Sequence, residues 1–595
     1  MNHPASTQSQ VEELPRSGSE TFLTRLPALG SQATDKARAR ATTAFLIGLA
    51  LICAATTLIG AVPTHMFGHD TFIPLEMGWR VLHGQRPDVD FVSGWGPVWF
   101  LLAAAGLAIS RHSVDGIGYA NAIMAVIVAV WSFALGRDRL LPLWRVIFSL
   151  FLAALVVAPY PLGISPLQSS HAMVYNRYGF ALLGLILLEC LEPSLNLPKQ
   201  NRLGARLGGF WEGLSTGAAL SLTLFLKASY FLVGAGIVVA LALILTRVEV
   251  PRGLKTARDD NKELGRWPEG HLYLNLRRIL GMLVGFAAVS LALLAYLRFD
   301  LLAMLRDLRM TGAARNAVFT SEGIVNKLTS RPSMLLTVVL FAWVSALVLG
   351  NRIPRWRGWR LPLAGVLLFG ADLALMITNQ QWEGFPLSAA FAILLSSDIL
   401  RDQQAQLAAQ ASSYRPLYAG ALCLGVLLFV PQFAGDLFGL AYGVWSKETA
   451  PGATEVVRFI SPNLAPLILY DGHIPRSNGR VLVTYVNDGV DLLQRSSRPD
   501  ETILAIDMTN VFPYALERPP AHGGIASPTY HFNIDDDHRP SDDEFFGDAA
   551  IVMVPKHPAL DDHFYQDFLR AYEPGLHQRY TLAAESSWWW MYRKK

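Results

Sequence analysis

The sequence predicts a mainly α-helical, polytopic membrane protein with a small C-terminal α/β domain. Of the 595 residues, 52% are hydrophobic and only 16% are charged, and the mean hydropathy is +0.31. The apolar residues fall into blocks, several of which approach the roughly 20 residues that a helix needs to cross a bilayer. From about residue 445 the blocks give way to short apolar runs between polar segments. This pattern excludes an ordinary soluble protein.

Apolar blocks follow one another from residue 43 to about residue 440. The stretch before them is polar and has no apolar core, so we expect no cleavable signal peptide. The blocks lie at 43–63, 97–110, 117–136, 146–163, 178–191, 212–226, 230–246, 279–297, 334–350, 361–378, 385–400 and 417–436.

The distribution of Lys and Arg orients these blocks, because loops on the cytoplasmic side are enriched in both. The block at 97–110 is short and follows a helix-breaking segment, so it could cross the membrane or lie on its surface. If it lies on the surface, the segments on the inner side hold 25 Lys and Arg, against 10 in the outer segments before the tail. If it crosses, the basic loops at 247–278 and 352–360 face outward. The surface arrangement is favoured, with about 11 transmembrane helices plus juxtamembrane helices.

This orientation divides the chain into three parts. Residues 1–42 are expected to form a disordered cytoplasmic tail, and residues 43–440 the transmembrane domain, whose first outer loop is 64–116. Residues 445–595 are expected to form an α/β domain outside the membrane. In a bacterium the protein would be a multi-pass protein of the inner (plasma) membrane, and this domain would be periplasmic.

Within the C-terminal domain, strands and helices are predicted to alternate. The strands are predicted from β-branched and apolar runs, and a loop-rich insertion is expected at 517–547. The predicted strands are 481–486, 502–507 and 550–555, and the predicted helices are 488–495 and 563–572.

Four polar segments then share the outer face of the membrane domain: the first outer loop and three short segments next to apolar blocks. Their convergence is the pattern of an outward-facing substrate site, although helix ends and loops are often polar for other reasons. Lys227 stands in a very short turn and could also extend to the membrane surface. The candidate binding residues in the three short segments are His171, Asn176, Arg177, Lys227, Asn379 and Gln380.

The first outer loop carries carboxylates directly after the first apolar block. Asp70 is placed to act as a general base toward a substrate at the membrane surface. Asp88 and Asp90 flank a turn and could point to the same pocket, although Asp90 could simply cap a local turn. Donors outside the cytoplasmic membrane are typically lipid-linked, and a sugar on polyprenyl phosphate is common. Arg80, Arg177 and Lys227 could bind the phosphate.

At this point the loop resembles a known family. Asp70 is followed by Gly78-Trp79-Arg80-Val81-Leu82-x-Gly84-x-x-Pro87-x-x-Asp90-Phe91 and by Gly96-Pro97. This pattern is similar to the first outer loop of GT-C-fold glycosyltransferases, above all bacterial members related to protein O-mannosyltransferases and lipid A glycosyltransferases. The resemblance implies inverting transfer of a hexosyl or pentosyl group from a polyprenyl-phosphate sugar. Asp70 would stand at the catalytic acidic position and Asp90 at the second acidic position.

The loop also departs from the family pattern. Many members have a second acid next to the first, whereas His69 and Thr71 flank Asp70 here, so no cofactor is certain and a divalent-cation requirement is left open. Some members carry Lys just before the proline that is Pro97 here, where this chain has Gly96. Phosphate binding would then fall to Lys227 or Arg177.

The predicted partners are a polyprenyl-phosphate sugar donor, membrane lipids and a glycan, lipid or protein acceptor; no nucleic-acid partner is expected. Two alternatives remain. A polysaccharide ligase or polymerase would depend on Arg and His in later outer loops. A transporter or lipid flippase would need charges near the middle of the membrane, for which Asp372 and Asp398 are the clearest candidates.

Three further segments have two interpretations each. The segment that begins at Leu301 is amphipathic and could lie on the membrane or attract an anionic headgroup. The run 535–537, near His531 and His538, could bind a cation or be a solvated loop. The run 588–590 could pack within the domain or touch the membrane surface.

Overall fold

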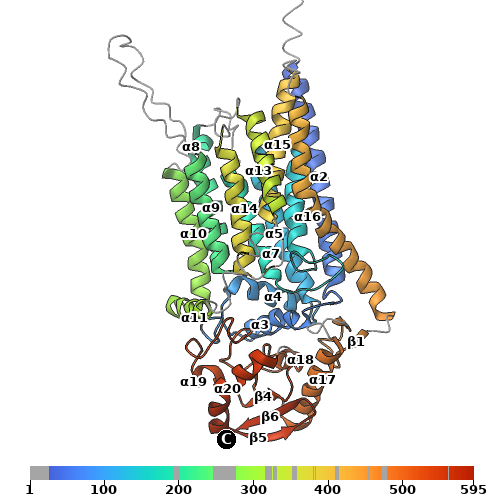
Figure 1. Ribbon diagram of the computed structural model, residues 1–595, viewed down its shortest axis with the longest axis vertical. Helices are drawn as coiled ribbons and strands as arrows, with labels where there is room; N and C mark the ends of the chain where they lie inside the picture. Colours follow the sequence, from blue (N-terminus) through green and yellow to red (C-terminus); the bar gives the residue numbers. More distant parts are fainter. Residues whose placement is uncertain are drawn as a thin grey trace, which may run out of the picture.

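The structure, a computed structural model, is a bundle of long helices with a smaller α/β domain at one end (Figure 1). The N-terminal end of the first long helix lies at the opposite end of the bundle from this domain. The structure describes residues 26–191, 202–245, 276–314, 325, 332–350, 358–379, 381, 384–408, 415–452, 456–471, 479–559 and 562–595. The predicted disordered tail was 1–42, but residues 26–42 form the first part of α2 (Leu26–Ile59). Residues 1–25 lie outside the described residues, as do most of the basic loops that orient the chain.

The long helices match the predicted apolar blocks. Seven of the described helices are long and apolar enough to cross a membrane, which confirms the multi-pass class, whereas the count of eleven stays a prediction. Proline begins three helices of the bundle, where its missing N–H costs nothing. The described helices of the bundle, these seven and four others, are α2 (Leu26–Ile59), α5 (Gly116–Leu135), α6 (Pro142–Val157), α7 (Val174–Leu191), α8 (Arg202–Leu224), α9 (Ala228–Leu245), α10 (Leu276–Tyr296), α13 (Pro332–Leu349), α14 (Arg360–Thr378), α15 (Pro386–Ala408) and α16 (Arg415–Thr449).

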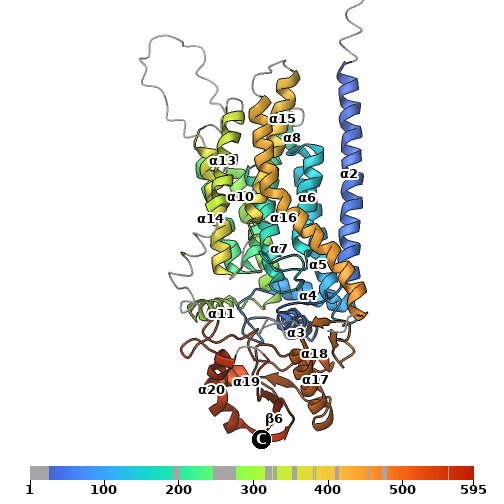
Figure 2. The same ribbon diagram turned by 45° about the vertical axis from the view of Figure 1, so that its right-hand side comes forward.

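Three shorter helices lie between the bundle and the C-terminal domain: α3 (Phe72–Leu82), α4 (Pro97–Ile109) and α11 (Leu301–Ala314) (Figures 1 and 2). The 13 residues of α4 span only about 20 Å at 1.5 Å per residue, which is too short for a hydrocarbon core of about 30 Å. Its place beside α3 agrees with the interpretation of 97–110 as a surface helix.

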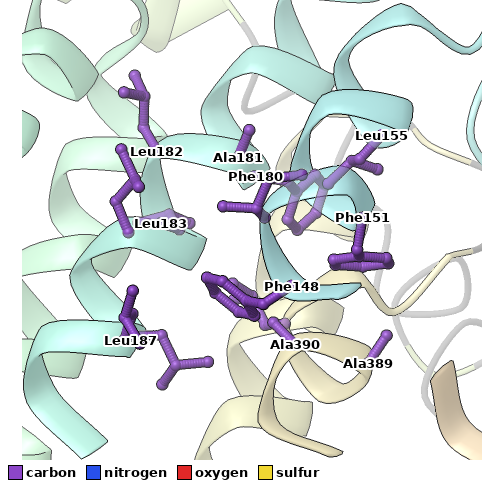
Figure 3. Packing of buried hydrophobic residues seen from close by; sticks show 14 of the residues in the cluster. Phe148, Phe151, Leu155, Phe180, Ala181, Leu182, Leu183, Leu187, Ala389 and Ala390 are labelled. Carbon is purple, nitrogen blue, oxygen red and sulfur yellow. The ribbon is translucent and has the colours of Figure 1, made fainter. Parts of the chain in front are cut away.

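The centre of the bundle is α7, whose residues are all buried. Figure 3 shows how its neighbours pack against it: Phe148 and Phe151 of α6 lie beside Phe180 of α7, and Ala389 and Ala390 of α15 leave room for these rings. Large side chains opposite small ones fill the space without voids.

The pair α8 and α10 packs through glycine. A Cβ atom at Gly213 would lie 2.0 Å from the carbonyl oxygen of Arg278, and one at Gly281 would lie 2.0 Å from that of Phe210. The two backbones are therefore in direct contact, which is typical of membrane helices that associate through small residues.

The C-terminal domain has a four-stranded sheet in the order β3-β4-β6-β5. Strands β3 and β4 are parallel and the other two pairs are antiparallel. A separate pair, β1 (Val456–Arg458) and β2 (Ile468–Tyr470), is antiparallel. The other elements are α17 (Gly479–Ser496), β3 (Ile503–Ala505), α18 (Phe512–Ala515), α19 (Asp542–Phe546), β4 (Ile551–Pro555), α20 (Asp562–Arg579), β5 (Tyr580–Glu585) and β6 (Trp589–Lys594).

Two of the three predicted strands are found, as β3 and β4, but the strand at 481–486 is wrong. This run belongs to α17, and its buried residues Val483, Val486, Val490 and Leu493 recur at helical spacing. The β-branched composition favoured a strand, but the longer amphipathic pattern decided the local structure. The tryptophan run packs within the domain: Trp589 of β6 is fully buried and donates a hydrogen bond from its indole N–H to the carbonyl of Tyr485.

The α8–α10 contact generates a stability prediction. Gly281→Val should destabilise the full chain by about 1–3 kcal/mol, because its side chain must push the two helices apart. Gly236→Val is the matched control, since no atom lies within 4 Å of a Cβ at this position of α9. Thermal unfolding in detergent would compare the two variants; equal melting temperatures would contradict the described packing.

Candidate functional site

The first outer loop is held between the bundle and the C-terminal domain by Arg80. The Arg80 guanidinium is 1% exposed and pairs with Glu76, at 3.3 Å between Nε and Oε1. It also donates to the side chain of Gln85 and to the carbonyl oxygens of Ala521 and Gly523 in the C-terminal domain. The N–H donors of Arg80 are thus bonded to other atoms of the protein. These contacts do not support the predicted role of Arg80 as a phosphate partner.

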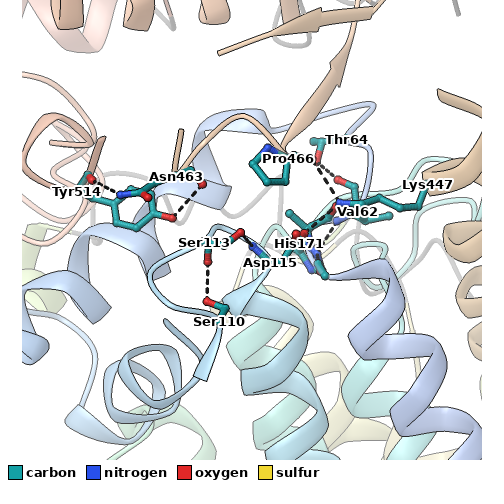
Figure 4. A network of polar contacts seen from close by, with 12 residues as sticks. Val62, Thr64, Ser110, Ser113, Asp115, His171, Lys447, Asn463, Pro466 and Tyr514 are labelled. Carbon is teal, nitrogen blue, oxygen red and sulfur yellow. Dashed lines mark hydrogen bonds and ion pairs between the residues drawn. The ribbon is translucent and has the colours of Figure 1, made fainter. Parts of the chain in front are cut away.

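A second set of polar contacts joins the end of α2 to the C-terminal domain (Figure 4). Asp115, just before α5, accepts hydrogen bonds from the backbone N–H of Ala61 at 2.8 Å and from the ammonium of Lys447 at 3.0 Å. Lys447 also donates to the carbonyl oxygens of Ala61 and Pro466. The chain that leaves α2 therefore has a fixed path toward Asp70.

His171 fixes the same path from the other side. Its Nε2 accepts a hydrogen bond from the backbone N–H of Val62 at 3.0 Å, and burial lowers its pKa to about 4. The imidazole is therefore neutral near pH 7, as an acceptor must be. The backbone N–H of His65 donates to the carbonyl of Ser169 nearby. These contacts give His171 a structural role in placing the loop.

Asp70 lies in the short helix η1 (Gly68–Thr71), under the C-terminal domain. Its Oδ1 is 2.9 Å from Nε2 of His69, and both side chains are 10% exposed. A Cβ atom at Gly68 would come within 3.0–3.3 Å of Leu482 and Leu469, which shows how closely the domain covers this helix. The candidate base is thus a partly accessible carboxyl that is paired with a histidine.

Asp88 forms a carboxyl pair with Asp307 of α11. Burial raises the pKa of Asp88 well above its usual range, and the charge of Asp307 and the hydrogen bond to it add to the rise. Asp307 accepts from the backbone N–H of Ser93 at 3.1 Å and pairs with Arg306, and burial raises its pKa to about 6. Arg306 in turn reaches Glu544 of α19 at 2.7 Å. Asp88 therefore joins the first outer loop to α11 and does not face the pair that Asp70 forms with His69.

Asp90 closes a local turn. Its Oδ2 accepts a hydrogen bond from the backbone N–H of Arg86 at 2.8 Å, and its own N–H donates to the carbonyl of Arg86 at 2.9 Å. Its carbonyl accepts from Gly523 of the C-terminal domain. The structure thus gives Asp90 the capping place that the sequence left open as an alternative, and no described contact joins it to Asp70.

The end of the loop meets the short turn of Lys227. Backbone N–H groups of Gly96 and Val98 donate to the carbonyls of Leu226 and Phe225. The Lys227 ammonium lies 4.7 Å from the ring centre of Tyr175, at the start of α7. Trp95 and Trp99 also contact Tyr175, with ring centres 5.7 and 4.7 Å away. Three of the predicted outer segments therefore meet here.

Asn176 follows Tyr175 of this aromatic group, and its amide makes no hydrogen bond to the described residues. It is 1% exposed, and neither its Nδ2 nor its Oδ1 has a hydrogen-bond partner among the described residues. It lines a cavity of about 190 Å³ together with Gln381, Met173 and two residues before α7. Gln381 donates to the hydroxyl of Tyr230 at 3.3 Å.

Asn379, at the end of α14, belongs to the same region. It is 4% exposed and accepts from the Ser229 hydroxyl at 3.4 Å, while its Nδ2 has no partner within the described part of the chain. Gln380 lies outside the described residues. The fourth predicted segment thus also reaches the bundle end near Lys227.

Arg177 does not join this group. Its guanidinium pairs with Asp436 of α16 at 3.0 Å and donates to the carbonyl oxygens of Tyr160 and Leu155. All of these partners are protein atoms inside the bundle, so the predicted phosphate role is not supported for Arg177. A buried cation with four protein contacts is part of the helix packing.

The two acids that a transporter would use also have structural partners. Asp372 accepts from the backbone N–H groups of Leu387 and Ser388 and so caps α15. Asp398 pairs with Arg401 at 2.9 Å. Neither position offers a free charge in the bundle.

Two acids with raised pKa values escaped the sequence analysis. Asp307 stood in a segment interpreted only as amphipathic; in the structure Met304, Asp307 and Thr311 are buried, whereas Leu305 is exposed. Asp507 was taken as the last residue of a strand, but it follows β3, and burial of its carboxyl raises its pKa to about 6.

Metal binding receives no support from these clusters. Within the described ranges, no group of three or more His, Cys, Asp or Glu side chains is placed to hold a metal ion. Asp535 instead accepts from His538, and His531 pairs with Asp567.

The fold is similar to solved membrane glycosyltransferases. No family model and no curated protein matches the chain. ArnT from Cupriavidus metallidurans bound to undecaprenyl phosphate matches with a TM-score of 0.41 and 11% identity, over 92% of this chain and 97% of that chain. The archaeal oligosaccharyltransferase AglB from Archaeoglobus fulgidus, in complex with an inhibitory peptide and a dolichol-phosphate, matches with a TM-score of 0.38 and 12% identity, over 86% and 69%.

Both of these structures hold a polyprenyl phosphate, undecaprenyl phosphate in ArnT and a dolichol-phosphate in AglB. The TM-scores lie below 0.5, so the function proposed below depends on the residues of this chain.

The pair of Asp88 and Asp307 predicts a pH-dependent contact. Both carboxyls have pKa values above those of free Asp, so the docked state binds protons that the undocked state releases. Docking of α11 should be strongest below about pH 4, near the pKa of free Asp, and should weaken as pH rises through about 6, where Asp307 ionises in the docked state. Hydrogen-exchange protection of residues 301–314, corrected for intrinsic rates, would measure this effect.

Asp88→Asn should flatten the pH dependence, because the amide can still donate to Asp307 but cannot ionise. Asp90→Asn, a neighbouring acid outside the pair, is the matched control. A wild-type protection that does not change between about pH 4 and about pH 7, an interval that includes the pKa of free Asp and the raised pKa of Asp307, would contradict the shared proton.

Proposed function

We propose that this protein is a membrane glycosyltransferase that moves a sugar from a polyprenyl-phosphate donor to a lipid, glycan or protein acceptor. The observation that carries the proposal is the group of Lys227, Asn176 and Asn379 at the bundle end, beneath the first outer loop. Transfer takes place at the end of the bundle that carries the C-terminal domain, which is the periplasmic side of a bacterial inner membrane.

The unused amide groups favour a polar ligand. A buried polar group without a partner costs about 1–3 kcal/mol, so proteins keep few of them unless a ligand supplies the bond. Asn176 and Asn379 together leave two N–H₂ groups and one carbonyl in this state among the described residues. With the ammonium of Lys227, they are the donors that a phosphate requires.

An apolar surface for the prenyl chain adjoins this group. A small apolar cavity lies between α3, α4, α5 and α7, and its lining includes Leu75, Trp99 and Leu107. Trp99 also belongs to the aromatic group on Tyr175. The polar phosphate site and the apolar cavity therefore share one wall.

Asp70 supplies the base in this mechanism. The acceptor hydroxyl gives its proton to the Asp70 carboxylate while its oxygen forms a bond to the anomeric carbon, and the bond from that carbon to the phosphate oxygen breaks. The lipid phosphate leaves with the bonding electron pair, and Lys227 and the two amides stabilise its negative charge. A single displacement of this kind inverts the anomeric centre, and the transferred sugar is a hexose or a pentose.

One segment connects the two halves of the proposed site. Residues 168–177 hold the path to Asp70 through Ser169 and His171, and they end at Tyr175 and Asn176. One short stretch of chain thus carries the phosphate donor Asn176 and holds the segment that leads to the base, which can keep the two in register for the reaction.

The role of Asp70 can be tested by one substitution. Asp70→Asn should lower transfer by about 10²- to 10⁴-fold, because the amide cannot take the hydroxyl proton. The assay would incubate purified full-length protein with radiolabelled polyprenyl-phosphate sugars and membrane extract. Asp90→Asn should retain most of the activity. Transfer by Asp70→Asn at the wild-type rate would overturn the mechanism.

Asn176→Leu separates binding from stability. Replacing an unpaired buried amide by an apolar side chain of similar size should leave the melting temperature unchanged or raise it, and should raise the KM for the donor about tenfold through loss of a charge-assisted hydrogen bond. Ser149→Ala is the control, because this buried hydroxyl of α6 also has no partner within the described residues but lies in the apolar core.

The outcome for Asn176→Leu that would count against a ligand role is an unchanged donor KM in a folded protein. Ser149→Ala should be as stable as wild type or more so and should keep the wild-type KM.

A further inference from the structure

Asp507 is a half-buried carboxyl of the C-terminal domain that lines one cavity together with His69, the residue next to the candidate base. It follows β3, and its two oxygens accept hydrogen bonds from the Tyr485 hydroxyl at 2.6 Å and from the backbone N–H of Met508 at 2.7 Å. These bonds hold the carboxyl in one orientation at the edge of the sheet.

A small cavity lies between Asp507 and the first outer loop. Asp507 and Thr509 line it from the domain, and His69 and Phe72 line it from η1 and α3. His69 is the residue whose Nε2 contacts Asp70 at 2.9 Å. An imidazole has a second ring nitrogen, and the group near that nitrogen decides how the ring is oriented and protonated.

The charges around Asp507 come from several elements. Burial raises the pKa of Asp507 to about 6; the Tyr485 and Met508 hydrogen bonds and the charge of His69 act in the opposite direction, and Glu76 of α3 adds to the rise. Tyr485 of α17 itself faces Tyr565 of α20. Of these groups, only His69 also touches Asp70.

We propose that Asp507 is a positioning residue. From the C-terminal domain it orients the imidazole of His69, and this imidazole in turn positions the Asp70 carboxyl. This inference rests on the proposed function, in which Asp70 is the base. The order carboxylate, imidazole, carboxylate runs from the domain to the reacting group. The C-terminal domain is then a part of the catalytic centre and more than a cover over it.

A purely structural role is the main alternative. Asp507 would then serve only to join α17 to the end of β3 through Tyr485. Asp507→Asn distinguishes the two roles, because the amide oxygen can still accept one of these bonds while the negative charge is lost. Asp507→Glu keeps the charge and changes the length of the side chain.

The experiment measures transfer by the full chain in lipid nanodiscs from pH 5 to 9 at saturating and limiting donor. We expect Asp507→Asn to lower kcat about tenfold or more with little change in the KM for the donor, and to remove the wild-type loss of activity as pH falls through about 6. Asp507→Glu should restore part of the rate. Asp488→Asn is the matched control, because this acid of α17 accepts from the backbone N–H of Trp588 and does not line the cavity.

A second readout needs no turnover. The exchange of the C2 hydrogen of His69 with deuterium, followed by mass spectrometry, changes rate as the ring is protonated. The pH of that change should move to lower values in Asp507→Asn and stay in place in Asp488→Asn. An unmoved His69 profile, or a kcat and pH profile of Asp507→Asn equal to wild type, would overturn the proposal.

The two readouts separate this inference from the proposed function. If wild type and Asp70→Asn transfer sugar equally, the proposed function fails whatever happens at His69. If Asp70→Asn is inactive and Asp507→Asn matches wild type in both readouts, only the role of Asp507 fails.

Discussion

The buried guanidinium of Arg80 is the contact on which the arrangement of the candidate site depends. It pairs with Glu76 inside α3 and donates to two carbonyl oxygens of the insertion in the C-terminal domain. An arginine without water must find such partners, since a lone buried charge costs several kcal/mol. Once they are in place, η1 and α3 lie against the domain, and Asp70 is held at the boundary between membrane helices and sheet.

Much of the architecture could be predicted from the sequence, because long apolar blocks indicate membrane helices and the placement of Lys and Arg indicates their orientation. The surface position of 97–110 followed from charge alone, and the short turn of Lys227 marked a place where the chain meets other polar segments. Local pattern failed at 481–486, where β-branched residues belong to a helix whose apolar face became clear only over 18 residues.

The candidate site was predictable only in part, for a physical reason. Arg80 and Arg177 have the composition of phosphate ligands, and only the fold reveals that carbonyl and carboxylate oxygens of the protein already surround them. Asp307 lies 214 residues from its partner Ser93, and no local signal connects the two. Asp507 likewise became visible as a site residue only when β3 placed it opposite His69.

The C-terminal domain contacts the membrane domain and the first outer loop at several points. It covers η1 through Leu469 and Leu482, binds the first outer loop through Arg80, and reaches α11 through Glu544. In the proposed mechanism, a domain with that many contacts to the loop would control how an acceptor reaches Asp70, while the lipid donor would enter from the membrane helices. The two substrates need different surroundings, because a prenyl chain requires an apolar surface and an acceptor hydroxyl requires water or polar groups.

The central claim is that the end of the bundle beneath the first outer loop binds a lipid phosphate. The most direct measurement is photo-crosslinking of the full-length protein in nanodiscs with a polyprenyl phosphate that carries a diazirine beside the phosphate, followed by peptide mapping. The account predicts labelling of the peptides that contain Tyr175, Asn176 and Lys227, and competition by unlabelled polyprenyl phosphate. Labelling confined to the lipid-facing surfaces of α2 and α10, without competition, would contradict it.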